Sequence, residues 1–218
     1  MSWKNNMAII CPTITATSKA LYQNQMNDVA KFAKRIHVDL ADGVFAPTKL
    51  VDPKDAWWPV GITADVHLMY ETSRPFLKDL IALEPHMIIL HAESVGNFYE
   101  LAKTIRSNGI KVGIALLEAT PVSKIRQAID DIDHVLIFSG DLGYFGGHAN
   151  LSLLQKVTEI KRYNASVEIG WDGGINESNI HKLVLGGVDV LNVGGAIHLS
   201  KNPTKAYNKL KALAESST

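Results

Sequence analysis

Eight short apolar runs, each about the length of a buried strand, alternate along this chain with longer amphipathic stretches. Runs rich in Ile and Val are typical of parallel strands that are covered on both faces. The amphipathic stretches have helical spacing, as in residues 18–34. Eight strands separated by helices predict an α/β fold, a single (β/α)8 TIM barrel. The predicted strands are 8–14, 35–40, 62–68, 86–91, 111–117, 133–139, 166–171 and 188–193.

The intervening segments predict helices, with one exception. Residues 46–61 contain three prolines, which are too many for a long helix, so we expect a loop with one short helix there. No linker, low-complexity stretch or strong internal repeat interrupts the pattern. We therefore predict one domain that spans residues 1–218. The predicted helices are 18–34, 73–83, 96–108, 121–130, 150–163, 176–186 and 201–214.

Charge and cysteine content narrow the classes of partner and the compartment. Lys plus Arg and Asp plus Glu both number 22, and no basic run stands out, so we expect neither nucleic acid nor a membrane as a partner. The single cysteine, Cys11, excludes an intramolecular disulfide and fits a reducing compartment. The N-terminal apolar run is too short for a signal peptide, and no run approaches a membrane span. We expect a cytoplasmic protein.

Histidine and aspartate residues stand where several of the predicted strands end. His37 and Asp39 are two residues apart, so their side chains point to the same face of a strand. His67 and Asp172 lie at the ends of two other strands. Because strand ends converge on one face of a barrel, these four side chains predict a site for a divalent cation. The spacing alone leaves open that they are ordinary hydrogen-bonded residues.

Four more polar residues near the strand ends have less specific roles. His91 and Glu93 either orient a metal ligand or merely end the fourth strand. Asp65 shares the face of His67 but lies deeper, so we expect it to be ion-paired or to support a ligand. Asp42 precedes Gly43 and predicts a turn.

Three glycine-rich segments follow the sixth, seventh and eighth strands. They are residues 140–150, 171–178 and 192–198. Glycine allows backbone N–H groups to approach an anion closely, and late loops of such barrels commonly bind phosphate. Tight turns are the alternative. Three such loops together favour a ligand that carries a phosphate group.

These motifs together resemble the ribulose-phosphate 3-epimerase family, one of the ribulose-phosphate binding barrels. The resemblance covers nearly the whole chain in order, and its first and third motifs are highly specific together. Thr13 stands where the family has serine and keeps the hydroxyl group. The motifs are CPTI, HVDLADGVFAPT, DVHLM, GIALLEAT, GYFGGH, WDGGI and VGGAIH.

The resemblance implies one divalent metal ion, either zinc, iron, manganese or cobalt, held by His37, Asp39, His67 and Asp172. It implies that Asp39 and Asp172 are the catalytic acid and base. The implied substrate-binding residues are Thr13, His67, Met69, Gly146, Gly147, His148, Gly173, Gly174, Gly194 and Gly195.

The implied reaction inverts C3 of a small phosphorylated ketose, ribulose 5-phosphate or xylulose 5-phosphate. Two-base proton transfer would proceed through an enediolate that the cation stabilises.

The family forms dimers and hexamers, so the resemblance also implies a homo-oligomer. Its members place methionines around the metal, and Met69 remains, whereas Ala41 and Phe138 replace two others.

Three alternatives stay open. Phe138, His148 and Trp171 depart from the family's pattern, which favours an epimerase of a six-carbon ketose phosphate as one alternative. A second is a phosphosugar-binding relative without turnover, although two retained aspartates argue against it. A third is a related decarboxylase or hexulose-phosphate synthase. Those enzymes use Asp-x-Lys-x-x-Asp, and the matching residues 39–42 contain no lysine.

Overall fold

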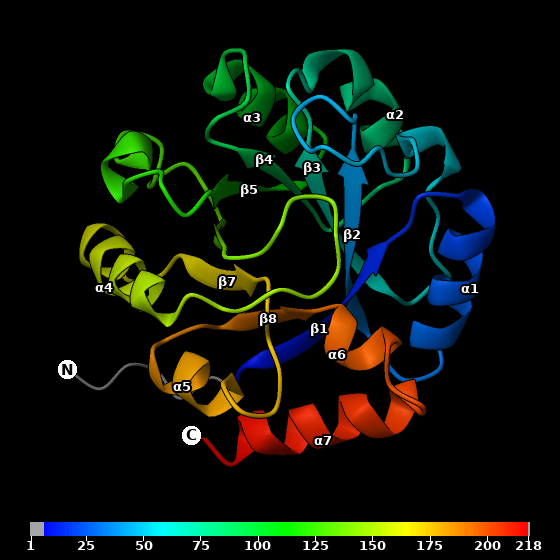
Figure 1. Cartoon of the computed structure of the whole chain (residues 1–218). Coiled ribbons are helices and arrows are strands. Elements are labelled where there is room, and N and C mark those ends of the chain that lie inside the picture. The colour runs from blue at the N-terminus through cyan, green and yellow to red at the C-terminus, as the bar shows by residue number, and fades with distance from the viewer. Residues whose placement is uncertain (1–6, 218) are drawn as a thin grey trace.

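A computed structural model describes residues 7–217, and its eight strands form a closed parallel barrel in chain order (Figure 1). Strand β8 pairs with β1 and completes the cylinder. The predicted TIM barrel is confirmed. The assignment of residues 1–218 to one domain stays a prediction, and residues 1–6 and 218 lie outside the described residues. The strands are β1 (Ile9–Thr15), β2 (Arg35–Ala41), β3 (Thr63–Met69), β4 (Met87–His91), β5 (Lys111–Leu116), β6 (His134–Phe138), β7 (Glu168–Asp172) and β8 (Val190–Val193).

Helices surround the barrel, and six of the seven predicted segments contain an α-helix in the predicted order (Figure 1). Several begin at a capping side chain; the Ser18 hydroxyl, for example, accepts a hydrogen bond from the N–H of Leu21. A short additional helix, α6, follows β8. The α-helices are α1 (Lys19–Val29), α2 (Leu77–Ala82), α3 (Phe98–Ser107), α4 (Leu154–Tyr163), α5 (Ile180–Leu185), α6 (Gly195–His198) and α7 (Pro203–Glu215). Short 3-10 helices are η1 (Pro53–Asp55), η2 (Arg74–Phe76), η3 (Val122–Ile125) and η4 (Leu151–Leu153).

The predicted helix over residues 121–130 is wrong, because only η3 and a series of turns form there. Its backbone bonds join residues three apart, such as the Lys124 N–H to the Pro121 carbonyl. Val122 and Ile125 are also three apart, and both are buried against the barrel. A 3-10 helix has three residues per turn, so it places both side chains on the same side as well as an α-helix does. In residues 46–61 the expected short helix is confirmed as η1.

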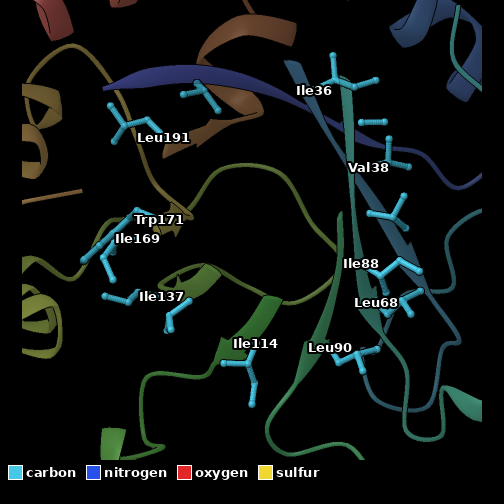
Figure 2. Close-up of a cluster of buried hydrophobic side chains, with 14 of the residues drawn as sticks. Ile36, Val38, Leu68, Ile88, Leu90, Ile114, Ile137, Ile169, Trp171 and Leu191 are labelled. Carbon is cyan, nitrogen blue, oxygen red and sulfur yellow. The ribbon is translucent and has the colours of Figure 1, made fainter. Parts of the chain in front are cut away.

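The hydrophobic core lies mainly between the strands and the helices outside them. Alternate strand residues, such as Ile36 and Val38 on β2, contribute to it (Figure 2). A smaller group inside the barrel contains Met87, Ile89 and Leu136. Because strand side chains alternate between faces, packing the outer face with apolar residues leaves the inner face free to carry polar groups. No helix within residues 7–217 is long and apolar enough to cross a bilayer.

Candidate active site

Four side chains from three strands meet at the carboxyl end of the barrel. His37 and Asp39 come from β2, His67 from β3 and Asp172 from β7, and all four are buried. One nitrogen or oxygen atom of each lies within 4.8 Å of those of the other three. His37 Nε2 lies 3.3 Å from Asp39 Oδ1 and 3.4 Å from Asp172 Oδ2. The structure thus gathers the four residues that the sequence singles out.

Strand register explains why these residues meet. Asp39 lies opposite His67 in the pairing of β2 with β3, and His67 Nδ1 lies 3.0 Å from Asp39 Oδ1. His37 and Asp39 share the inner face of β2 because they are two residues apart.

The donor set fits a divalent cation. Bonds of about 2.0–2.2 Å in a tetrahedral site separate neighbouring ligand atoms by roughly 3.3–3.6 Å, close to the spacing around His37 Nε2. His37 Nε2 and Asp172 Oδ2 are buried and lack hydrogen-bond partners within the described residues. Buried polar atoms normally have a partner, and a cation between these two would supply it.

Electrostatics also favours positive charge at this point. Burial opposes protonation of His37, but the carboxylates of Asp172 and Asp39 outweigh it and raise the pKa of His37 to about 10. Burial likewise opposes ionisation of Asp39, yet His37 and His67 hold the pKa of Asp39 below its ordinary value. Either a protonated imidazole or a bound cation between the two buried carboxylates would stabilise their ionised forms.

His91 and Glu93 orient His67. His67 Nε2 lies 2.8 Å from His91 Nε2, and His91 Nδ1 lies 3.2 Å from Glu93 Oε2. When His67 uses Nδ1 as a ligand atom, its Nε2–H donates to His91, and the Nδ1–H of His91 donates to Glu93. Burial is the main reason that the pKa of His91 falls to about 4, which keeps its ring neutral for this role.

Two nearby carboxylates have structural partners instead. Asp65 accepts hydrogen bonds of 2.7 Å from Arg35 Nε and from His86 Nδ1, which confirms the predicted ion pairing. Asp42 accepts from the N–H groups of Val44 and Phe45, which confirms the predicted turn.

A cavity of about 200 Å³ opens above the four-residue cluster, and both Asp39 and Asp172 line it. His67 Nδ1 lies 3.0 Å from Asp39 Oδ1, but neither His67 nor His148 lines the cavity. A direct contact of these two with substrate stays a prediction. The other predicted substrate-binding residues all line the cavity: Thr13, Met69, Gly146, Gly147, Gly173, Gly174, Gly194 and Gly195.

Of Phe138, His148 and Trp171, the three departures that favour a six-carbon substrate, only Phe138 lines the cavity. Trp171 is wholly buried in the outer core beside Ile169 (Figure 2). Its Nε1–H donates to the Gly173 carbonyl over 3.1 Å, so it supports the β7 loop from outside the barrel.

The three glycine-rich loops pack against one another around this cavity. A side-chain carbon on Gly195 would lie 3.4 Å from the backbone of Gly146, and one on Gly174 would overlap the backbone of Ala149. The N–H groups of Gly146, Gly147, Gly174 and Gly195 donate no hydrogen bond to protein acceptors within residues 7–217. These donors remain available to an anion.

Thr15, Asn192 and Phe145 are among the cavity residues that sequence reasoning missed. Thr15 donates from its hydroxyl to Asp39 Oδ2 over 2.6 Å. Asn192 lines the cavity with a buried Oδ1 that lacks a partner within the described chain. Phe145 stacks on His198, with ring centroids 5.2 Å apart. For Thr15 a signal existed, because it stands two residues after Thr13 and must share its face of β1.

The fold and the site define a TIM-barrel enzyme with a candidate divalent-metal centre beneath glycine-rich loops. The model of the Ribulose-phosphate 3 epimerase family matches residues 9–198. The chain belongs to this family and is an isomerase of the epimerase type.

Named relatives agree over most of the chain. The Ribulose-phosphate 3-epimerase of Helicobacter pylori strain J99 is 35% identical over 184 residues, which cover 81% of this chain and 84% of the relative. The Ribulose-phosphate 3-epimerase of Bacillus subtilis is 29% identical over 214 residues, covering 94% and 99% respectively.

Solved structures show the same fold at much lower identity. The 3-hexulose-6-phosphate synthase of Salmonella typhimurium superimposes with a TM-score of 0.71 at 11% identity, covering 96% of this chain and 99% of the synthase. At that identity the likeness supports the barrel and carries no functional argument.

Proposed function

We propose that the protein is a metal-dependent epimerase that interconverts ribulose 5-phosphate and xylulose 5-phosphate by inverting C3. The observation that carries the proposal is that Asp39 and Asp172, from non-neighbouring strands, line one cavity and flank one candidate cation site. The names of the related epimerases supply the substrate.

The two carboxylates provide the proton chemistry. Inversion requires a base on one face of C3 and an acid on the other. Asp39 enters the cavity from β2, and Asp172 enters from β7. With C3 between them, one carboxylate removes the proton to give an enediolate, and the other returns a proton from the opposite face. Their roles exchange when the reaction runs backwards.

His37, Asp39, His67 and Asp172 would hold the cation. A bound divalent ion supplies stabilisation of the negative charge that develops on the ketone oxygen and the neighbouring hydroxyl oxygen. Two imidazoles and two carboxylates suit zinc, iron, manganese or cobalt, and the donor types alone do not select among them.

The glycine-rich loops and Asn192 hold the rest of the substrate. The unpaired N–H groups of Gly146, Gly147, Gly174 and Gly195 would receive the phosphate group. Asn192 lies opposite Asp172 in the strand pairing, so its amide would receive a sugar hydroxyl near the reacting carbon. Together these contacts keep C3 between the two carboxylates.

We also propose that the protein acts as a homo-oligomer in the cytoplasm.

The activity test is a panel of phosphorylated ketoses assayed with each candidate metal after treatment with chelator. The panel contains ribulose 5-phosphate, xylulose 5-phosphate and six-carbon ketose 6-phosphates. The proposal predicts that the five-carbon pair has the highest kcat/KM and that activity disappears with chelator and returns with metal. A higher kcat/KM for a six-carbon substrate would replace the proposed substrate, and activity that survives complete metal removal would contradict the proposed mechanism.

A further inference from the structure

We propose that Thr15 is a positioning residue that fixes the rotation of the Asp39 carboxylate, and that Gln25 holds Thr15 in place for this task. The inference rests on the proposed function, because it assigns different tasks to the two oxygens of Asp39.

The two carboxylate oxygens of Asp39 have separate partners. Oδ1 faces the candidate ligand atoms, 3.3 Å from His37 Nε2 and 3.0 Å from His67 Nδ1. Oδ2 accepts the hydroxyl hydrogen bond of Thr15 over 2.6 Å. Both Thr15 and Asp39 line the cavity, so Oδ2 is held on the cavity side while Oδ1 remains with the histidines.

Thr15 is itself held on two sides. It is the last residue of β1, opposite Asp39 in the pairing with β2. Gln25 on α1 is buried, and its Oε1 accepts from the Thr15 N–H over 3.1 Å. Its Nε2 donates to the Thr15 carbonyl over 3.2 Å. One side chain therefore binds both backbone polar groups of Thr15, and a β-branched residue on a fixed backbone has few hydroxyl directions available.

This rotation matters because Asp39 serves two purposes in the proposed mechanism. One oxygen must remain in the ligand set, while the other must face C3 to exchange a proton. A carboxylate that is free to turn can present both oxygens to a cation. The Thr15 hydroxyl opposes that turn, since a short hydrogen bond to an ionised carboxylate is stronger than one between neutral groups.

The test compares Thr15→Val with Thr15→Ser and with the control Thr63→Val. Valine keeps the branched shape but removes the donor, and serine keeps the donor. Thr63 begins β3 at the opposite end of the barrel. We expect Thr15→Val to lower kcat by roughly 10- to 100-fold, the range that one hydrogen bond to a charged group supports. KM should change less than about 3-fold, since no substrate contact is removed. Thr15→Ser should keep most of the wild-type kcat, because serine keeps the hydroxyl donor.

A second measurement separates positioning from general packing. Cobalt(II) bound in four-coordinate sites absorbs visible light more strongly than in sites of higher coordination. The wild-type and Thr15→Ser proteins should show the stronger spectrum, and Thr15→Val should show a weaker one as Asp39 turns toward the ion. Gln25→Leu should shift the spectrum in the same direction, because it releases Thr15.

The outcomes distinguish this inference from the proposed function. Folded Thr15→Val with wild-type kcat and an unchanged cobalt spectrum overturns the positioning role. Equal losses in Thr15→Ser and Thr15→Val also overturn it, since the hydroxyl would not be what matters. If the wild-type protein acts on no ketose phosphate, the proposed function fails. In that case a weaker cobalt spectrum in Thr15→Val, together with a wild-type spectrum in Thr15→Ser, still supports the control of Asp39 by Thr15.

Discussion

Arg35 and Glu168 join β2 to β7 across the barrel through two hydrogen bonds of 2.8 and 2.7 Å. They are the first residues of these strands, and four residues later the same strands carry Asp39 and Asp172. A guanidinium and a carboxylate paired through two bonds have a fixed relative geometry. The pair therefore fixes the separation of the two strands whose far ends hold the proposed acid and base.

Replacing Arg35 should destabilise the fold strongly. Arg35 also donates to Asp65, so Arg35→Met leaves two carboxylates without their cation in the barrel interior. Removing one partner of a buried ion pair costs about 3–5 kcal/mol, and we expect the lower end because Glu168 is partly exposed. Chemical denaturation measures the free energy of unfolding. Arg74→Met is the control, because its exposed pair with Glu100 contributes less than about 1 kcal/mol. An equal loss of unfolding free energy in Arg35→Met and Arg74→Met would show that Arg35 does not form a buried ion pair that stabilises the fold.

The same network predicts loss of stability in acid. Burial opposes ionisation of Glu168, but Arg35 and His134 outweigh it and hold its pKa below the ordinary value. A lowered folded-state pKa stabilises the protein above the unfolded value of about 4.3, and this contribution is lost as pH falls through the folded value. The urea midpoint should therefore fall more steeply below about pH 4.5 in the wild type than in Glu168→Gln. If the urea midpoint falls with pH equally steeply in both proteins, Glu168 does not contribute to the loss of stability in acid.

The packing of the glycine-rich loops predicts a position-specific effect of alanine. Gly174 has a φ of +68°, and a methyl group there would overlap the backbone of Ala149. Gly174→Ala should displace the β6 loop and raise KM for a phosphorylated ketose by roughly 10-fold or more, through loss of about one charge-assisted hydrogen bond. Gly109→Ala has a similar φ of +76° but open space around it, so it should leave KM unchanged. An equal change in KM for both variants would mean that strain alone, and not the loop contact, is responsible.

The ligand set predicts metal content. His67→Ala removes one of four donors, so the purified protein should hold clearly less divalent metal by elemental analysis than the wild type. His181→Ala serves as the control, because His181 contacts Ser217 on the outer surface and should not change the metal content. Wild-type metal content in His67→Ala would remove this residue from the proposed ligand set.

Much of the site could be predicted because strand geometry is regular. The two-residue spacing of His37 and Asp39 places both on one face without any tertiary information. The same rule, applied one residue before Asp172, places Trp171 on the outer face, where the structure has it. The use of Trp171 as an argument for a six-carbon substrate therefore conflicted with the two-residue period that the sequence already contained.

Contacts between elements could not be predicted in the same way. The hydrogen bond between Thr15 and Asp39 depends on the register of β1 with β2, which neither strand specifies alone. The Gln25 contacts depend on how α1 docks on β1. In residues 121–130 the apolar spacing fits both a 3-10 and an α-helix, so the period could not decide between them.

The central claim is that Asp39 and Asp172 exchange the C3 proton from opposite faces of one substrate. The rate at which Asp172→Asn epimerises ribulose 5-phosphate, with folding verified by circular dichroism, tests it most directly. Since an amide cannot exchange this proton, the variant should be folded and at least about 100-fold slower than the wild type. A folded Asp172→Asn protein with a near-wild-type rate would contradict the two-carboxylate mechanism.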